Sequence, residues 1–277
     1  MSGADTTGRL AGAAATPVPE RPDGHGLLEG KVVVVTAAAG TGIGFATAQR
    51  CIEEGATVVV SDAHERRLAE AADQLAALPA AGGVRPLAVP CNVTDEAQVQ
   101  ALYDAAVTEH GRFDVAVNNA GLGGQVDVVD MTDEQWDLVL DVTLTGTFRC
   151  TRAALRHLYA RGEGGVIVNN ASVLGWRAQA GQAHYAAAKA GVMALTRCTA
   201  VEAAPHGVRV NAVAPSLAVH PFLNKVMDDA DLAELARREV FGRGAEVWEV
   251  ANVIAFLASG YATFMTGEVV SVSSQHP

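Results

Sequence analysis

Short runs of β-branched residues recur along the 277-residue chain, each bounded by polar or small residues. The first covers residues 31–36 and contains four consecutive valines. Runs of this length and composition are typical of central parallel strands, which are buried on both faces. The same pattern predicts further strands at residues 57–61, 85–90, 113–118, 166–170, 208–213 and 268–272.

Stretches of helical length separate the predicted strands. Helices are expected to begin at or just after Ile43, Asp62, Thr94, Thr132, Gln182 and Glu246. Thr94 is expected to cap the third helix, and Thr132 with Gln135 forms a capping box at the start of a long helix toward Ala160. Regular alternation of strands and helices calls for right-handed crossovers. The pattern therefore predicts an α/β fold with one doubly wound parallel sheet of about seven strands, flanked by helices.

The composition favours one ordinary globular domain. Hydrophobic residues make up 49% and charged residues 18% of the chain, which excludes a chain that is disordered throughout. Residues 1–26 are rich in Ala, Gly, Thr and Pro without an apolar run, so we expect a flexible tail rather than a secretory signal. Residues 27–277 then form one domain, because open α/β sheets of about 250 residues are commonly single cores.

Charge and cysteine spacing narrow the class of protein further. The net charge of −11 argues against a nucleic-acid partner, since phosphate contacts need clustered cations. No run approaches the roughly 18 apolar residues of a membrane-spanning helix. The cysteines are far apart and lack a CxxC pair, which predicts reduced, buried thiols in a cytoplasmic protein, and neither a disulfide framework nor a metal site. They are Cys51, Cys91, Cys150 and Cys198.

A glycine-rich loop follows the first predicted strand and opens the first helix. Glycines let the backbone turn tightly and approach a pyrophosphate, whose charge is held by free N–H groups at the helix N-terminus. The loop therefore predicts a dinucleotide-binding site. The residues expected to bind are Gly40, Thr41, Gly42, Ile43 and Gly44.

An acidic residue, Asp62, ends the second predicted strand, 18 residues after Gly44. A carboxylate there accepts hydrogen bonds from the adenosine ribose and repels a phosphate ester, so NAD is favoured over NADP as the cofactor. Arg66 and Arg67 follow closely and leave a pairing with such a phosphate open, although a solvated helix face explains them as well.

A serine, a tyrosine and a lysine have a spacing suited to proton transfer. Tyr185 and Lys189 are at positions i and i+4 of a predicted helix, so their polar tips can converge. A neighbouring ammonium favours the phenolate, and Ser172, at a strand end, is placed to donate a hydrogen bond to a substrate oxygen. Together they predict hydride transfer between a nicotinamide and a carbinol carbon. The structural alternative is a half-buried aromatic ring, a solvated charge and a helix cap.

These motifs resemble those of the short-chain dehydrogenase/reductase family from about Gly30 to the C-terminus. Residues 118–121 match the family's NNAG motif and residues 185–189 its YxxxK motif, with Ser172 13 residues before the tyrosine. The resemblance implies a Rossmann-type fold and a lysine that also holds the nicotinamide ribose. In such proteins the corresponding cofactor contacts come from Asn119, Ala120, Gly121, Tyr185 and Lys189.

The chain departs from the family pattern inside the expected site. Thr143 stands where the family has a catalytic asparagine that helps to hold a water in the proton relay. We expect the Thr143 hydroxyl and backbone carbonyl to maintain this relay, and the alternative is that Thr143 only packs. Asn92, followed by Val93, replaces the aspartate that usually receives the adenine amino group, and its amide oxygen can accept the same bond.

Further departures concern the two ends of the cofactor. Ala37 occupies the usual position of the first glycine, which makes Gly40 the stand-in. At the nicotinamide end we expect contacts from Pro215, Ala218 and His220, where His220 replaces a threonine and fits a pocket wall equally well.

The substrate pocket is expected from loops at the carboxyl ends of the strands, at residues 122–126, 173–184 and 217–241. Apolar residues there predict a bulky, apolar substrate, although they could equally form the core of a lid. They are Leu174, Trp176, Phe222, Leu223, Val226, Met227 and Leu232. Arg177 or Lys225 could meet the phosphates of an acyl carrier, while solvated surface charges are the ordinary interpretation.

The leading interpretation is an NAD(H)-dependent oxidoreductase that interconverts a secondary alcohol and a ketone. Resemblance to an actinobacterial branch implies a hydroxysteroid or a steroid side-chain 3-hydroxyacyl-CoA as substrate. The alternatives are an NADPH-dependent 3-oxoacyl reductase, acting on carrier-protein or CoA substrates, and a non-catalytic NAD(H)-binding regulator. The family also implies a homo-oligomer, a dimer or tetramer, through helices at residues 136–160 and 182–204, although core helices of a monomer have the same composition.

Overall fold

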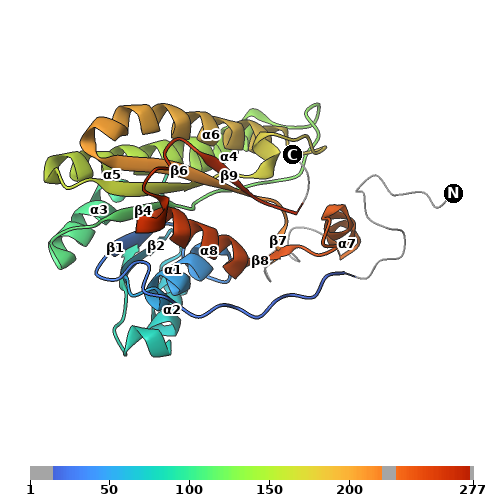
Figure 1. The fold of residues 1–277 in the computed structure, drawn as a ribbon. Helices are drawn as coiled ribbons and strands as arrows, with labels where there is room; N and C mark the ends of the chain where they lie inside the picture. The colour runs from blue at the N-terminus through green and yellow to red at the C-terminus, as the bar shows by residue number, and fades with distance from the viewer. Residues whose placement is uncertain (1–14, 220–228, 275–277) are drawn as a thin grey trace.

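The computed structural model describes residues 15–219 and 229–274, and its centre is one parallel sheet of seven strands (Figure 1). The strand order is β3-β2-β1-β4-β5-β6-β9, so the direction of winding reverses between β1 and β4. This confirms the predicted doubly wound fold, and all the predicted strands belong to this sheet. Their bounds are β1 Val32–Val35, β2 Thr57–Asp62, β3 Leu87–Pro90, β4 Val115–Asn118, β5 Gly165–Asn170, β6 Val208–Pro215 and β9 Val269–Val272.

Helices cover both faces of the sheet, with α1, α2 and α8 on one side and α3 to α6 on the other (Figure 1). Their bounds are α1 Ile43–Glu53, α2 Glu65–Ala76, α3 Glu96–His110, α4 Asp133–Leu140, α5 Gly146–Arg161, α6 Ala183–Ala203, α7 Asp229–Arg238 and α8 Val247–Ala258.

Two details of the helix prediction are wrong. The cap of α3 is Asp95 rather than Thr94, because the Asp95 carboxylate accepts hydrogen bonds from the N–H groups of Ala97 and Gln98. The predicted long helix toward Ala160 is interrupted by a π turn, Asp141–Thr145, between α4 and α5. The capping box at Thr132 is confirmed.

The valine run of β1 explains how the sheet joins two cores. Val33 and Val35 pack into the cluster that includes α1, α2 and α8, whereas Val32 and Val34 pack into the cluster that includes α3 and α5. Val33, Val34 and Val35 are completely inaccessible to solvent. Burying each such side chain contributes about 1.5–3 kcal/mol, so both faces of the strand need to be apolar.

The segment before β1 is bonded to α1. The buried Arg50 donates hydrogen bonds to the carbonyls of Pro22 and Asp23, and its ion-pair partner Glu54 accepts from the N–H groups of His25 and Leu27. The N–H of Thr16 donates to the carbonyl of Phe241 at 2.8 Å. The flexibility predicted for residues 1–26 stays a prediction, and residues 1–14 lie outside the described part of the chain.

Two short strands and helix α7 form a small second layer beside the sheet. Strand β7, Ala218–Val219, pairs with β8, Ala245–Glu246, and α7 lies near this pair (Figure 1). His220 and residues 221–228, expected to contact cofactor or substrate, lie outside the described residues.

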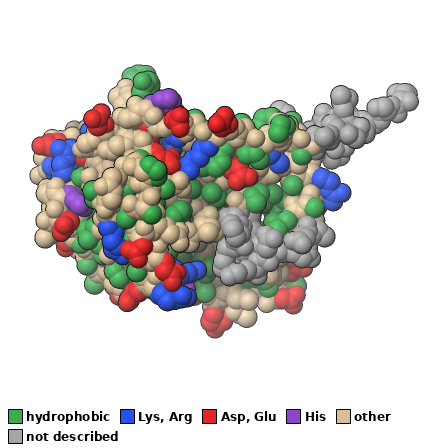
Figure 2. All heavy atoms as spheres, turned by 90° about the horizontal axis from the view of Figure 1, so that it is seen from below, with side chains coloured by type: hydrophobic (Ala, Val, Ile, Leu, Met, Phe, Trp, Pro, Cys, Tyr) green, Lys and Arg blue, Asp and Glu red, His purple; other side chains and the backbone are tan. Residues whose placement is uncertain are grey.

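The surface and the cysteines add little chemistry of their own. Acidic and basic side chains are interspersed on the face that Figure 2 shows. None of the helices in the described part of the chain is long and apolar enough to cross a membrane. Among those residues, no group of three or more His, Cys, Asp or Glu side chains could hold a metal ion.

Cys51, Cys91 and Cys150 are buried, but Cys198 is exposed, so the expectation of a buried thiol is wrong there.

Candidate functional site

Ser172, Tyr185 and Lys189 meet at the carboxyl end of β5. Ser172 follows that strand and caps the 3-10 turn Val173–Gly175, where its Oγ accepts a hydrogen bond of 3.2 Å from the N–H of Leu174. Tyr185 is in the first turn of α6, and its side chain interacts with that of Ser172. Lys189 follows one turn later, and its side chain is almost completely buried.

The Lys189 ammonium is held by the end of the neighbouring strand. Its Nζ donates a hydrogen bond of 2.5 Å to the carbonyl oxygen of Asn170 and lies 5.5 Å from the centroid of the Tyr185 ring. An added Cβ at Gly121 would lie 3.3 Å from this Nζ, so the backbone of the NNAG segment passes directly beside the lysine.

Burial dominates the proton affinities of this group. It lowers the pKa of Lys189 to about 7 and raises the pKa of Tyr185 to about 12, although the hydrogen bond with Ser172 acts to lower the latter pKa. At neutral pH the phenol is therefore protonated and the lysine is partly neutral. Desolvation of both groups thus outweighs the attraction between ammonium and phenolate that the sequence suggested.

The glycine loop has one closed side and one open side. An added Cβ at Gly44 would lie 2.2 Å from the carbonyl oxygen of Ala37 and 2.5 Å from Nδ2 of Asn119, so only glycine allows α1 to pack here. At Gly40, which has φ +96°, and at Gly42 it would meet no atom within 4 Å. This side of the loop thus leaves space for a ligand at the N-terminus of α1, where an anion is favoured.

Asp62 lies against this loop. Its Oδ2 accepts a hydrogen bond of 3.3 Å from the N–H of Ala39, and its Oδ1 accepts one of 2.9 Å from the N–H of His64. Arg66, by contrast, is exposed and pairs with Glu70 at 3.1 Å. The Asp62 carboxylate is therefore bonded to the loop, whereas the Arg66 guanidinium pairs within its own helix.

The residues expected at the adenine differ in accessibility. Asn92 is exposed, and its Oδ1 accepts a hydrogen bond of 3.1 Å from the N–H of Thr94. Val93 is buried, and its side chain would be 2.6 Å from a Cβ added at Gly146. Val93 thus packs against α5, whereas the Asn92 amide remains open to solvent.

Asparagine side chains join β1, β4 and β5 beneath the loop. Asn119 donates from its backbone N–H to Oγ1 of Thr36 at 3.0 Å and from Nδ2 to the Thr36 carbonyl at 3.2 Å. Its Oδ1 accepts from Nδ2 of Asn170 at 2.9 Å. The N–H of Ala120 also donates to Thr36 Oγ1, at 3.2 Å. These bonds hold the ends of three strands at a common level.

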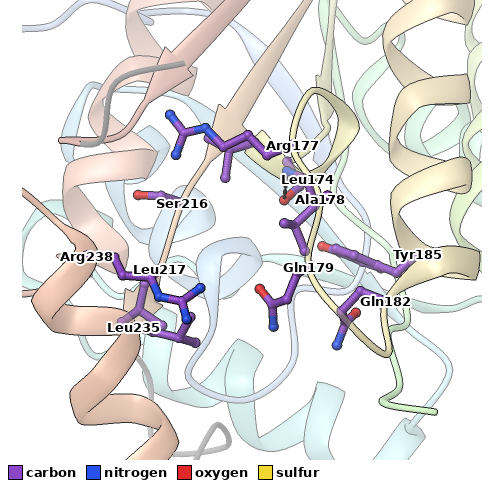
Figure 3. A pocket seen from close by; sticks show the side chains of 12 residues that line it. Leu174, Arg177, Ala178, Gln179, Gln182, Tyr185, Ser216, Leu217, Leu235 and Arg238 are labelled. Atoms are coloured by element: carbon purple, nitrogen blue, oxygen red, sulfur yellow. Dashed lines mark hydrogen bonds between the residues drawn. The ribbon is translucent and has the colours of Figure 1, made fainter. Parts of the chain in front are cut away.

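A cavity of about 230 Å³ opens in front of Ser172 and Tyr185 (Figure 3). The tyrosine hydroxyl points into it from α6, while α7 and the end of β6 form the opposite wall. The lining residues are Ser172, Val173, Leu174, Arg177, Ala178, Gln179, Gln182, Tyr185, Ser216, Leu217, Leu235 and Arg238. Trp176, expected in this wall, is 45% exposed and is not part of the lining.

The chain is similar to known proteins over most of its length. Residues 37–274 match the family described as enoyl-(acyl carrier protein) reductase. The chain belongs to the short-chain dehydrogenase/reductase family. It is therefore an oxidoreductase that acts on CH–OH groups and binds a nicotinamide cofactor.

Individual relatives cover nearly the whole chain. It is 64% identical, over 94% of its length and 98% of the relative's, to the (5R,7aS)-5-hydroxy-7a-methyl-1-oxo-2,3,5,6,7,7a-hexahydro-1H-indene-carboxyl-CoA reductase of Mycobacterium tuberculosis. It is 40% identical to the 3-oxoacyl-[acyl-carrier-protein] reductase FabG of Thermotoga maritima, over 88% of this chain and 97% of that one. The crystal structure of a short chain dehydrogenase from Mycobacterium smegmatis superposes on this chain with a TM-score of 0.83. The two sequences are 60% identical, and the match covers 94% of this chain and 99% of that one.

Thr143 is the clearest departure of this short-chain dehydrogenase/reductase from the family pattern. It is completely buried in the π turn, and its hydroxyl donates to the carbonyl of Leu122 at 3.0 Å and accepts from the N–H of Leu122 at 2.9 Å. Its carbonyl oxygen accepts from the Thr147 hydroxyl at 2.7 Å. This geometry favours the alternative that Thr143 packs rather than relays a proton, because the proton of its hydroxyl is already donated to Leu122. The two bonds to Leu122 also fix the backbone after Gly121.

The site also contains residues that the sequence argument missed. The Asn170 carbonyl holds Lys189, while Oδ1 of Asn170 is buried and has no hydrogen-bond partner in the described part of the chain. Arg238 and Leu235 reach the cavity from α7. The NN pair at the end of β5 was the available signal for Asn170, whereas no local sequence pattern indicates that α7 lies beside the cavity.

Proposed function

We propose that this protein interconverts a secondary alcohol and a ketone on a cyclic acyl-CoA thioester, with NAD(H) as the cofactor. The observation that carries the proposal is that Ser172 and Tyr185 face the same cavity, with Lys189 one helical turn further along α6. The substrate class is supported by the relative from Mycobacterium tuberculosis, whose name specifies a bicyclic carboxyl-CoA substrate.

The residues around the glycine loop fit a dinucleotide. The open side of the loop would receive the pyrophosphate, the Asp62 carboxylate the adenosine ribose, and Lys189 the nicotinamide ribose beside Gly121. The unsatisfied Oδ1 of Asn170 provides a further acceptor beside the lysine. Pro215 and Ala218, at the junction of β6 and β7, would border the nicotinamide, which supplies a hydride acceptor or donor when bound.

The chemical step follows from the protonation states. In ketone reduction the Tyr185 hydroxyl donates its proton to the substrate oxygen while the carbonyl carbon gains a hydride, and Ser172 donates a hydrogen bond to the same oxygen. Because burial raises the pKa of Tyr185 to about 12, the phenol carries the required proton at neutral pH. Alcohol oxidation needs the phenolate instead, so its rate is expected to rise with pH.

The preference for NAD rests on the position of Asp62. Its carboxylate faces the loop through the Ala39 N–H, where the 2′-phosphate of NADP would introduce a second negative charge. We expect NADH to quench the tryptophan fluorescence of the protein at lower concentrations than NADPH does. If both nucleotides quenched the fluorescence at the same concentrations, this assignment would be contradicted.

The reaction is tested with CoA thioesters of alicyclic hydroxy acids, measured by NADH formation. Tyr185→Phe should lower turnover by about a thousandfold, in the range of general acid–base contributions, without weakening NADH binding. Turnover that survives this substitution would refute the assigned chemistry. A wild-type protein that binds NADH but oxidises no alcohol in the panel would point to the regulator alternative.

A second candidate is an NADPH-dependent 3-oxoacyl reductase. It is favoured by the 40% identity to the reductase of Thermotoga maritima. Reduction of acetoacetyl-CoA with NADPH, faster than that of cyclic ketones with NADH, would establish this function instead.

We also propose that the chain forms a homodimer or homotetramer through α4, α5 and α6. Large apolar side chains on α4 and α5 are exposed in the single chain, with Trp136 at 38%, Leu138 at 53% and Phe148 at 40%. Light scattering measures the assembly directly, and a monomer at micromolar concentration would overturn the proposal.

A further inference from the structure

The cavity at Tyr185 has an unusual charge for this protein. Arg177 and Arg238 are the only charged side chains among the described residues that line it. The whole chain carries 31 acidic residues against 20 basic ones, so a lining whose described residues include two cations and no carboxylate runs against its average composition. A cavity of this kind attracts anions.

The two arginines lie at the end of the cavity away from the reacting group. Figure 3 shows the guanidinium groups of Arg177 and Arg238 on the side of Ser216, whereas the Tyr185 hydroxyl approaches from the opposite side. Arg177 follows the 3-10 turn after β5, and Arg238 ends α7. The cavity therefore has a proton-transfer end and a cationic end, which come from different elements.

The pairing of Arg238 within the protein is weak. Its Nε lies 3.4 Å from Oε1 of Glu234, and its side chain is 55% exposed. Glu234 also pairs with Arg237, at 2.5 Å, so one carboxylate serves two guanidinium groups. An exposed and shared ion pair of this kind is readily exchanged for a ligand anion.

We propose that Arg177 and Arg238 form an anion subsite that binds the acidic end of the substrate while Tyr185 acts on its alcohol or ketone. The substrate is then a hydroxy or oxo acid derivative, and an uncharged steroid alcohol is a poor one. Guanidinium groups bind carboxylates and phosphates with the same planar donor geometry, so the anion is either a free carboxylate or a phosphate of CoA. This inference rests on the proposed function and deepens it.

The experiment compares three forms of one cyclic hydroxy acid, namely the CoA thioester, the free carboxylate and the methyl ester, each assayed for NADH formation. We expect kcat/KM of at least one charged form to exceed that of the methyl ester by about tenfold or more. Added salt should reduce this advantage by screening the exposed Arg238. The charged form with the larger advantage identifies the source of the anion.

Substitutions test the subsite itself. Arg238→Gln should raise KM for the preferred charged form about tenfold and leave KM for the methyl ester unchanged. Arg237→Gln is the matched control, because Arg237 precedes Arg238 on α7 and pairs with the same Glu234 but does not line the cavity. Arg177→Gln should act like Arg238→Gln, and unchanged NADH affinity verifies that each variant is folded.

Two outcomes would overturn the subsite while the proposed function stands. One is equal kcat/KM for all three forms in the wild type. The other is the same KM for the charged form in Arg238→Gln and Arg237→Gln. Failure of the proposed function is different, since none of the three forms would then be oxidised. In that case the subsite is tested by binding alone: the affinity of wild type is compared with that of Arg238→Gln, for free CoA and for the free carboxylate. If the two proteins bind each ligand equally well, the subsite is overturned.

Discussion

Replacement of the buried Lys189 by methionine should stabilise the protein without nucleotide, although it removes a group proposed for the site. Burial lowers the pKa of this lysine from its ordinary value of 10.5 to about 7. The folded state therefore disfavours the charged form, while the unfolded chain does not. Methionine has a similar length and no charge, so it removes this unfavourable term.

The magnitude and its pH dependence follow from proton linkage. One pKa unit corresponds to about 1.4 kcal/mol, so below neutral pH the buried ammonium of Lys189 costs on the order of 5 kcal/mol. Between pH 7 and 10.5 the unfolded chain binds a proton that the folded protein has released, so the stability of the wild type rises with pH in this window. By pH 9 the cost has fallen by about 3 kcal/mol. Loss of the hydrogen bond to Asn170 offsets about 1–3 kcal/mol of the gain.

The assay is urea denaturation of wild type, Lys189→Met and Lys31→Met at pH 6 and pH 9, at one protein concentration and without nucleotide. Lys31 is exposed, so its replacement controls for the loss of a positive charge. We expect Lys189→Met to be more stable than the wild type at pH 6 and the gap to shrink by about 3 kcal/mol at pH 9. A gap that is independent of pH, or one that Lys31→Met reproduces, would refute the reasoning.

Three further predictions concern the loop and its surroundings. Gly44→Ala should destabilise the protein by more than about 2 kcal/mol in thermal melts, because the new Cβ would lie 2.2 Å from a backbone oxygen. Gly42→Ala is the control and should cost less than about 1 kcal/mol, because a Cβ at Gly42 meets no atom within 4 Å. Thr143→Val should lower kcat/KM about tenfold without moving the pH profile, and turnover equal to wild type would show that its hydroxyl is not needed. Asp62→Ala should lower the ratio of KM for NADPH to KM for NADH about tenfold or more in steady-state assays.

The fold could be predicted because burial on both faces leaves a strong pattern in the sequence. Residues 32–36 are continuously β-branched, and the alternate valines of β1 belong to two different cores. The π turn Asp141–Thr145 left no such pattern, because its residues are compatible with a regular helix and only the hydrogen-bond spacing differs. The cap of α3 was assigned one residue early, since Thr94 and Asp95 are both good capping residues.

Only those features of the candidate site that depend on neighbouring residues in one helix or strand could be predicted. The spacing of Tyr185 and Lys189 brings both to one face of α6, and the end of β5 delivers Ser172 to them. The burial that lowers the pKa of Lys189 depends instead on how α6 packs against Asn170 and the NNAG segment. Contacts between elements distant in sequence decide this property, so the proximity of these side chains could be predicted from the sequence, whereas their electrostatics could not.

The two ends of the cavity come from different structural elements, so substrate specificity and proton transfer depend on different parts of the protein. Tyr185 and Lys189 are on α6, whose position is set by the sheet, and the asparagine bonds beneath the loop hold the neighbouring strand ends. Arg238 is on α7, in the small layer after β6, outside that network. A change at Arg238 therefore leaves the proton-transfer geometry intact, so its effect should fall on KM rather than on kcat. Relatives of this chain could then change the acid they accept by altering α7 alone, without altering the group that moves the proton.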